Sequence, residues 1–579
     1  MLKRMLRSLR EFKTSTILTL IFIIGEVIIE VLIPFITADL VNNIQAGAGL
    51  DYIVKTGLIL IAMAVASLCC GGIAGFTCAK ASAGFARNLR HDIFSKIQTF
   101  DFHNIDKFSS SSLVTRMTTD VQNVQMSFMT IIRMAIRAPL MLIFSVIMAA
   151  YMGGALAATF VIVIPVLGFG LFLVGKKAMP AFRRVFRKYD KLNEAIEENV
   201  RAMRVVKGFS REDYEKEKFE SASDSIRRDF TKAERIVAMN APLMQFCVYF
   251  NMIFIMLLGS KLAITSQGAT VNVGQISAML TYGFQILMQL MMLSMIYVIL
   301  TMSSESVKRI GEVLDETPAL TSPENAVNTI SDGSVDFEGV SFKYSESAEK
   351  FALESIDLHI KSGMTVGIIG GTGSSKSTLV QLIPRLYDAS VGTVKVGGRD
   401  VREYDVEALR SSVAMVLQKN LLFAGTVSDN LRWGDENASD EEIREACHLA
   451  QADSFVSAFP DGYDTMIDQG GTNVSGGQKQ RLCIARALLK KPKILILDDS
   501  TSAVDTATDA LIREGLKNYI PETTKIIIAQ RVASVQDADM IIVMDGGKIV
   551  DCGTHDELIE KSVIYREVYE QQTSGKEAA

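Results

Sequence analysis

Residues 365–378 read TVGIIGGTGSSKST, an apolar run that ends in a loop rich in glycine and serine. The apolar part, 365–369, predicts a buried β-strand, and an apolar helix is expected to start near Thr378. A glycine-rich loop between a strand and a helix wraps phosphates with backbone N–H groups, and the helix N-terminus adds positive potential. The stretch therefore predicts a phosphate-binding loop inside an α/β domain.

The residue types of this loop suit that chemistry, with one departure. Lys376 is expected to reach the β- and γ-phosphates of a nucleotide, and the Ser377 hydroxyl is expected to bind Mg²⁺. Ser375 stands where the pattern has a glycine, and its Cβ lies where the backbone approaches phosphate, so a lower affinity is expected. The predicted nucleotide contacts are Gly370, Gly371, Thr372, Gly373, Ser374, Ser375, Lys376, Ser377 and Thr378.

A second apolar run, 494–497 (ILIL), ends in Asp498 and Asp499. Carboxylates at the end of a buried strand can hold Mg²⁺ and an attacking water, although any core strand capped by a polar loop reads the same way. The order of this run after the phosphate loop favours the metal-binding interpretation. Strand-like and helical runs alternate after residue 332, which predicts an α/β domain with a partly parallel sheet.

Residues 474–478 read VSGGQ and lie between the two motifs. Here the chain resembles the ATP-binding cassette (ABC) family, whose signature reads LSGGQ. The resemblance implies that two cassettes meet head to tail, with each ATP between one phosphate loop and the opposite signature. The signature residues of this chain, expected against a partner's ATP, are Ser475, Gly476, Gly477 and Gln478.

Other positions match the same family in order. The resemblance implies that Tyr344 stacks on adenine and that Gln418 senses Mg²⁺ and faces the membrane domain. It also implies that Asp505 ends a loop, 502–505, that crosses to the partner subunit. ATP and Mg²⁺ are therefore the expected ligands. The residues expected to hold the metal are Ser377, Gln418 and Asp498.

Two positions depart from the family together. Asp499 stands where the family has its catalytic glutamate, and Gln530 stands where the family has a histidine that contacts the γ-phosphate. Aspartate is one methylene shorter, and glutamine can neither carry the imidazolium charge nor shuttle its proton. A positioned general base contributes about 10²–10⁴-fold, so ATP binding is expected to persist while hydrolysis becomes very slow.

The first half of the chain carries six apolar segments long enough to span a membrane. Long charged segments, 80–131 and 177–240, read as helices that continue out of the membrane. Lys and Arg concentrate in these two segments, so both termini and the cassette are expected in the cytoplasm. The expected spans are 15–38, 56–79, 132–152, 156–176, 241–263 and 277–300.

The order of the parts resembles a half-transporter of the ABC exporter branch. The fold expected is an all-α six-helix membrane domain with long cytoplasmic extensions, followed by an α/β P-loop nucleotide-binding domain. In that branch short helices at the extension tips dock on the cassettes; by position these are near 101–108 and 208–214. The expected division is a membrane domain at 1–311, a linker at 312–332, a cassette at 333–572 and a frayed tail at 573–579.

Charges inside spans point to function. Glu26 and Glu30 share one helix face, which either lines a cavity for cationic amphiphiles or pairs with another helix. Four methionines of the sixth span suit either a promiscuous apolar surface or ordinary packing. The residues proposed for a substrate cavity are Glu26, Glu30, Met288, Met291, Met292 and Met295.

The sequence thus predicts the degenerate half of a heterodimeric exporter of hydrophobic or amphiphilic substrates such as drugs, lipids or peptides. Its partner would be a second half-transporter with a complete catalytic site. A self-sufficient homodimer and a nucleotide-gated channel or regulatory subunit are the alternatives. Net charge is −5, which gives no hint of nucleic acid, and the seven cysteines form no CxxC pair, which fits a reducing cytosol. The basic start is read as leading into a first span rather than a cleaved signal, and a bacterial plasma membrane is expected.

Overall fold

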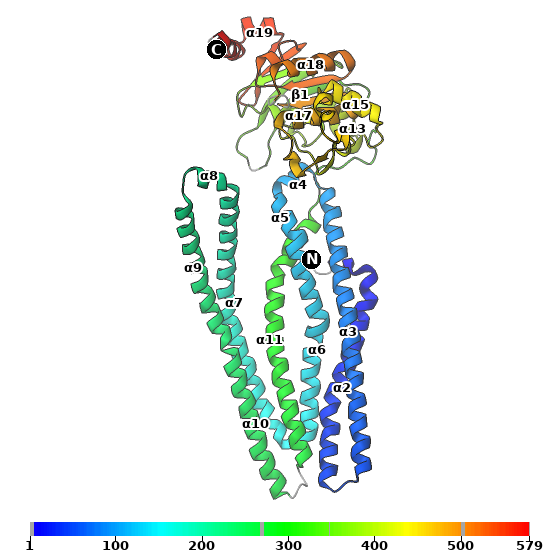
Figure 1. Ribbon diagram of the computed structural model, residues 1–579, viewed down its shortest axis with the longest axis vertical. Coiled ribbons are helices and arrows are strands. Elements are labelled where there is room, and N and C mark those ends of the chain that lie inside the picture. The colour runs from blue at the N-terminus through cyan, green and yellow to red at the C-terminus, as the bar shows by residue number, and fades with distance from the viewer. Residues whose placement is uncertain (1–4, 267–270, 347, 500–503, 578–579) are drawn as a thin grey trace. The chain divides into compact units, whose positions relative to one another are not determined.

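The computed structural model describes residues 5–266, 271–346, 348–499 and 504–577. Internal contacts divide the chain into two compact units, shown in Figure 1. The first, here called the membrane unit, comprises residues 1–99 and 108–316. The second, the cassette unit, comprises residues 100–107 and 317–579.

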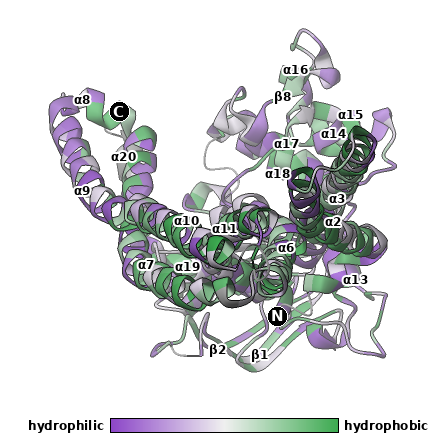
Figure 2. Cartoon of the chain, turned by 90° about the horizontal axis from the view of Figure 1, so that it is seen from below, coloured by the Kyte–Doolittle hydropathy of each residue, from purple (hydrophilic) through white to green (hydrophobic). Residues whose placement is uncertain are grey.

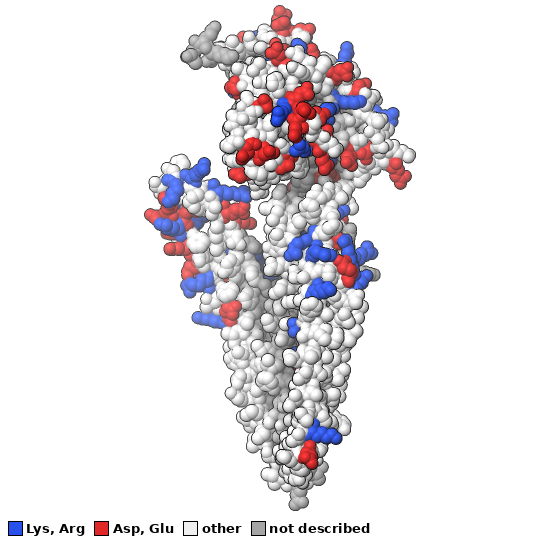
Figure 3. Space-filling model, turned by 45° about the vertical axis from the view of Figure 1, so that its right-hand side comes forward, with Lys and Arg blue, Asp and Glu red and all other residues white. Residues whose placement is uncertain are grey.

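Among the described residues of the membrane unit, six long helices are apolar enough to cross a bilayer. Each contains one predicted span, except that 156–157 fall in the short turn η3 (Gly154–Ala157), so the predicted all-α membrane domain is confirmed. The hydropathy colouring of Figure 2 shows green along these helices, and Figure 3 shows a long stretch with few charged side chains. The six are α2 (Lys13–Gln45), α3 (Leu50–Gln98), α6 (Val121–Gly153), α7 (Ala158–Arg201), α10 (Asn240–Thr265) and α11 (Val273–Asp315).

Helices α3 and α7 are longer than the hydrocarbon core of a bilayer is thick. At 1.5 Å per residue the 49 residues of α3 span about 74 Å, against about 30 Å of hydrocarbon. The second extension is a helical hairpin of α7, α8 (Met203–Gly208) and α9 (Glu212–Ala238). The predicted extension 80–131 is not one continuous helix. It contains α4 (Phe102–Lys107), which lies where a short helix was expected near 101–108, followed by α5 (Ser110–Thr115) and the π-helical η2 (Arg116–Asp120).

The interruption after α3 has a local cause. The Asp101 side chain accepts from the Asn104 backbone N–H at 2.9 Å, and the Asn104 side chain accepts from the Asp101 N–H at 3.1 Å. This reciprocal cap satisfies backbone donors that a continuous helix would bond internally, and so starts the separate helix α4.

The cassette unit is built on a six-stranded sheet in the order β12-β11-β3-β10-β9-β6. All its strands run parallel except β12 at the edge, which confirms the α/β prediction. Ile494 and Ile496 of β9 enter one core while Leu495 and Leu497 enter the other, so both faces of the sheet are covered. The strands are β3 (Thr365–Gly370), β6 (Val413–Val416), β9 (Ile494–Asp498), β10 (Thr524–Ile528), β11 (Met540–Asp545) and β12 (Lys548–Gly553).

Two smaller sheets and a set of helices complete this unit. An antiparallel sheet has the order β2-β1-β4-β5, and β7 pairs with β8. The remaining strands are β1 (Val335–Phe342), β2 (Leu353–Ile360), β4 (Val391–Val396), β5 (Arg399–Asp400), β7 (Gly425–Thr426) and β8 (Met466–Ile467). The helices are α12 (Lys376–Gln381), α13 (Val406–Ser412), α14 (Val427–Leu431), α15 (Asp440–Leu449), α16 (Asp453–Val456), α17 (Gly476–Leu489), α18 (Thr506–Tyr519), α19 (His555–Lys561) and α20 (Val563–Glu577).

The segment between the units differs from the predicted linker 312–332. Helix α11 continues to Asp315 because Ile310, Val313 and Leu314 are buried one helical turn apart. Residues from 317 onward belong to the cassette unit, where Val327 bridges Tyr404. At the other end α20 continues to Glu577, so most of the predicted tail 573–579 has a helical backbone.

Candidate nucleotide-binding site

The predicted phosphate and metal residues gather at the carboxyl edge of the parallel sheet. The phosphate loop follows β3, and Gln530 follows β10 by two residues. Asp498 ends β9, and Gln418 follows β6 by two residues. Because β3, β10, β9 and β6 are successive parallel neighbours, their carboxyl ends meet at one edge, where open α/β sheets bind ligands.

The phosphate loop has the backbone shape that its glycines permit. A Cβ on Gly370 would lie 2.2 Å from the Met544 carbonyl oxygen, so only glycine fits there. Gly373 has φ +84°, a conformation that L side chains rarely adopt. The Lys376 ammonium donates to the carbonyls of Gly370 and Gly371, each at 2.8 Å, and burial lowers its pKa.

Ser375 adopts the left-handed conformation, with φ 68° and ψ 27°, immediately before α12. This conformation explains why a glycine suits the position, since a residue with a Cβ pays about 1–2 kcal/mol there. The structure thus accommodates the serine in the loop shape at the cost of local strain.

Ser377 and Asp498 meet as predicted for a metal site. The Ser377 hydroxyl donates to an Asp498 carboxylate oxygen at 3.0 Å. Asp498 is buried, and burial raises the pKa of its carboxyl, with the nearby Asp499 charge adding to the rise. A hydroxyl and a single carboxylate are oxygen donors of the kind Mg²⁺ uses beside nucleotide phosphates, so the residues present fit that ion.

The two residues that depart from the family pattern contact each other. The Gln530 side-chain amide donates to an Asp499 carboxylate oxygen at 2.7 Å, and the Gln418 amide lies 3.5 Å from the same oxygen. Asp499 is buried and has φ 49°. Gln418 therefore lies beside Asp499, the neighbour in sequence of the predicted metal residue Asp498.

The backbone of Gln530 is held from the C-terminal helix. The Gln572 amide of α20 donates to the Gln530 carbonyl at 2.8 Å, and the Gln572 side-chain oxygen accepts from the Val532 N–H at 2.8 Å. Both hydrogen bonds fix the loop that follows β10. The sequence gives no local sign of this contact.

Tyr344, the predicted adenine platform, lies beside the start of α12. Its hydroxyl is 2.9 Å from the Thr378 hydroxyl oxygen, and its ring is half exposed. The structure therefore brings the predicted base and phosphate contacts together on one side of the cassette unit.

The signature residues cap a helix at the surface. The Ser475 hydroxyl accepts from the Gln478 N–H at 3.3 Å, and the Gln478 side chain accepts from the Ser475 N–H at 2.9 Å, a capping box at the start of α17. Ser475 and Gly476 are exposed. Asp505 caps α18 by accepting from the Thr508 N–H at 3.0 Å, whereas residues 502 and 503 of the predicted crossing loop lie outside the described residues.

In the membrane unit, the predicted glutamates pair with another helix. One Arg137 nitrogen on α6 lies 2.6 Å from Glu30 and 3.3 Å from Glu26, both on α2. The pairing alternative for these two glutamates therefore describes the structure. Met288, Met291, Met292 and Met295 are half buried or exposed along one face of α11.

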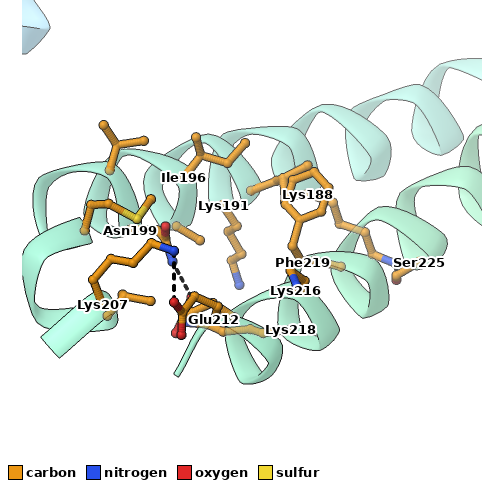
Figure 4. A pocket seen from close by; sticks show the side chains of 17 residues that line it. Lys188, Lys191, Ile196, Asn199, Lys207, Glu212, Lys216, Lys218, Phe219 and Ser225 are labelled. Carbon is orange, nitrogen blue, oxygen red and sulfur yellow. Dashed lines mark hydrogen bonds and ion pairs between the residues drawn. The ribbon is translucent and has the colours of Figure 1, made fainter. Parts of the chain in front are cut away.

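A large cleft of the membrane unit lies elsewhere. It encloses about 810 Å³ between α7 and α9, and Figure 4 shows Lys191 extending between the two helices and Lys207 bonded to Glu212. Its lining begins at Lys188, beyond the predicted fourth span, and includes none of the six residues proposed for a substrate cavity. The cleft belongs to the helical extension beyond the predicted spans.

Comparison with known proteins agrees with this architecture. Residues 16–291 match the family of the ABC transporter transmembrane region, and residues 353–502 match the ABC transporter family. An uncharacterized ABC transporter ATP-binding protein of Bacillus subtilis, YfiB, is 35% identical and covers 99% of this chain and 98% of its own. One from Mycobacterium tuberculosis is 34% identical over 99% of this chain and 98% of its own.

The fold also matches a solved structure, that of a bacterial Atm1-family ABC exporter with ATP bound. The TM-score is 0.84 at 21% identity, over 97% of this chain and 98% of that one. The chain belongs to the ABC transporter family. The family's transmembrane and ATP-binding regions lie in one chain, so it forms part of an ATP-driven transporter. Its fold is that of the solved exporter.

Proposed function

We propose that this chain is the degenerate-site subunit of a heterodimeric ABC exporter. The observation that carries the proposal is the 2.7 Å hydrogen bond from Gln530 to Asp499. The two positions that orient water and contact the γ-phosphate in the family are here occupied by residues that bind each other.

The chemistry of this pair supports slow hydrolysis. The amide donor occupies an oxygen of the carboxylate that would otherwise accept a proton from water. Gln530 has no titratable group with which to move that proton. Lys376, Ser377 and Asp498 remain in place, so MgATP binding is retained while its hydrolysis at this site is slow.

The other half of the site argues for a distinct partner. The signature of this chain is complete, exposed and fixed by the capping box of Ser475. It would complete an ATP site whose phosphate loop and catalytic glutamate come from a second half-transporter. A homodimer would contain two slow sites, and a channel or regulatory subunit would show no substrate flux coupled to hydrolysis.

We further propose that the substrates are hydrophobic or amphiphilic, because the spans expose apolar side chains such as Met288 and Met295. The ion pairs that Glu26 and Glu30 make with Arg137 weaken the specific case for cationic amphiphiles. The basic extensions support a cassette in the cytoplasm of a bacterial plasma membrane.

The test is the ATPase rate of this chain alone and after co-expression with the cassette chain encoded beside it. The lone chain is expected to be slow, and the Asp499→Glu, Gln530→His double variant is expected to gain about 10²-fold or more. Each single variant is expected to gain far less, because the residue left unchanged, Gln530 or Asp499, still hydrogen-bonds to the new side chain. Rapid hydrolysis by the unmodified lone chain would contradict the proposal and favour the homodimer.

A matched variant tests the signature. Ser475→Arg in this chain should abolish the activity of the pair while leaving MgATP binding by this chain unchanged. If the pair keeps its rate, the signature of this chain does not serve the partner's site.

A further inference from the structure

An aromatic cluster adjoins the proposed base site. The Tyr344 and Tyr387 rings meet edge to face with centroids 5.3 Å apart, and Phe342 packs against both, at 4.9 and 5.6 Å. Close-packed rings have little room to move independently. A displacement of the Tyr344 ring is therefore expected to displace the Tyr387 ring.

Tyr387 also contacts α4. Its hydroxyl donates to an Asp106 carboxylate oxygen at 2.7 Å, and its ring lies 5.9 Å from the Phe102 ring in an edge-on arrangement. Burial raises the pKa of the Tyr387 hydroxyl, and the Asp106 hydrogen bond adds to the rise, so the hydroxyl remains a proton donor. One side chain thus touches both the proposed adenine platform and the short helix between α3 and α5.

The start of α4 makes further contacts with the segment of the cassette unit that follows α11. The buried Asp101 carboxylate accepts from the backbone N–H groups of Ala319 and Leu320, at 2.6 and 3.0 Å. In sequence α4 directly follows α3 and precedes α5, both of the membrane unit. A shift of α4 therefore pulls on the chain that leads into the membrane helices.

We propose that Tyr387 is a positioning residue that couples occupancy of the base site at Tyr344 to α4 through its hydrogen bond to Asp106. The inference rests on the proposed ATP site. It attributes the effect of the nucleotide on α4 to the adenine end of the nucleotide. Asp499 and Gln530 lie at the other end, with the phosphates. Loss of the hydroxyl should leave nucleotide binding intact and disconnect α4 from it.

The experiment is amide hydrogen exchange on the full chain in lipid nanodiscs, with and without saturating MgATP. In the unmodified chain the nucleotide should slow exchange in 370–378 and also in 100–107, the latter by about 5-fold or more. In Tyr387→Phe, which keeps the ring, slowing in 370–378 should persist and slowing in 100–107 should be lost. Asp106→Ala should behave in the same way.

Two controls sharpen the result. Tyr404→Phe removes a hydroxyl that donates to the Val396 carbonyl at 2.9 Å, away from α4, and should keep the ligand-dependent slowing. Magnesium tripolyphosphate, which lacks a base, should slow exchange in 370–378 alone.

The outcomes separate the two proposals. Equal slowing of 100–107 in Tyr387→Phe, or slowing of that segment by tripolyphosphate, would overturn the assignment to Tyr387 and the base while leaving the ATP site intact. Failure of MgATP to slow exchange in 370–378 of the unmodified chain would overturn the ATP site, and the inference with it.

Discussion

Carboxylates that are at least half buried occur in both units, but the groups in direct contact with them differ in kind. Glu26 and Glu30 of the membrane unit share the guanidinium of Arg137, an ionic partner. Asp499 of the cassette unit accepts a hydrogen bond from the neutral amide of Gln530 and lies 3.5 Å from that of Gln418, with the Lys376 charge nearby. In an apolar span a charge is stabilised by an opposite charge in direct contact, whereas amide donors contact the carboxylate at this sheet edge and the Lys376 charge acts on it from nearby. The first arrangement joins two helices, and the second occupies an oxygen of a carboxylate at the nucleotide site.

The largest expected effect on stability is that of removing Arg137. Arg137→Met would leave two like charges half buried beside each other, and losing one partner of a buried pair costs about 3 kcal/mol or more. A lower unfolding midpoint in detergent is expected, with partial recovery in Arg137→Lys. The control is Arg133→Met, one helical turn earlier and exposed. An equal decrease of the unfolding midpoint in both Met variants would show that the ion pairs of Arg137 do not stabilise the membrane unit.

In the cassette unit the largest effect is expected on binding rather than folding. Lys376→Met should weaken MgATP binding by about 10–100-fold, because hydrogen bonds to charged groups contribute about 1.5–3 kcal/mol. Titration of fluorescent nucleotide measures this. Lys361→Met, at the other end of the same loop–strand element and exposed, should bind normally. Normal binding by Lys376→Met would remove Lys376 from the phosphate site.

The pH dependence of magnesium binding tests the environment of Asp498. Its pKa is raised by burial, so the carboxyl takes up a proton at a higher pH than an exposed aspartate does. Mg²⁺ requires the carboxylate, so the magnesium concentration for half-maximal ATP binding should rise as pH falls through that raised pKa, by about 10-fold per pH unit below it. Asp498→Asn should lose this dependence. A dependence unchanged in that variant would assign the proton to another group.

The smallest effect concerns the strained serine. Ser375→Gly should raise the unfolding midpoint, corresponding to about 1 kcal/mol, because glycine adopts φ 68° without the Cβ penalty. Ser374→Gly, a neighbour without positive φ, should not stabilise the chain. Equal shifts from both variants would show that the left-handed conformation of Ser375 costs nothing.

Local patterns in the sequence predicted most of the architecture. Spans are visible because the bilayer demands about 20 consecutive apolar residues, and the phosphate loop is visible because its residues are contiguous. The short helix α4 was expected near 101–108 only through the family resemblance, because a reciprocal Asp101–Asn104 cap inside a charged segment resembles any polar helix surface. The extent of α11 was missed because the polar residues after 303 mask the buried face of Ile310 and Val313.

Contacts between distant segments escaped prediction for a different reason. Asp499 and Gln530 meet because β9 and β10 are adjacent parallel strands, and strand order is not written in either motif. Glu26 and Arg137 meet through the packing of α2 on α6, which helical spacing alone does not specify. Tyr387 carries no local pattern at all; only the fold places its hydroxyl beside Asp106.

The hydrogen bonds of Gln572 to the loop that carries Gln530 make α20 part of the support of the proposed nucleotide site. Shortening the chain before α20, or fusing a rigid tag directly to its end, would therefore alter the readout of an ATPase assay as well as the solubility of the protein. A purification handle belongs at the N-terminus or beyond a flexible spacer, so that the measured rate reports on the native residues at 499 and 530.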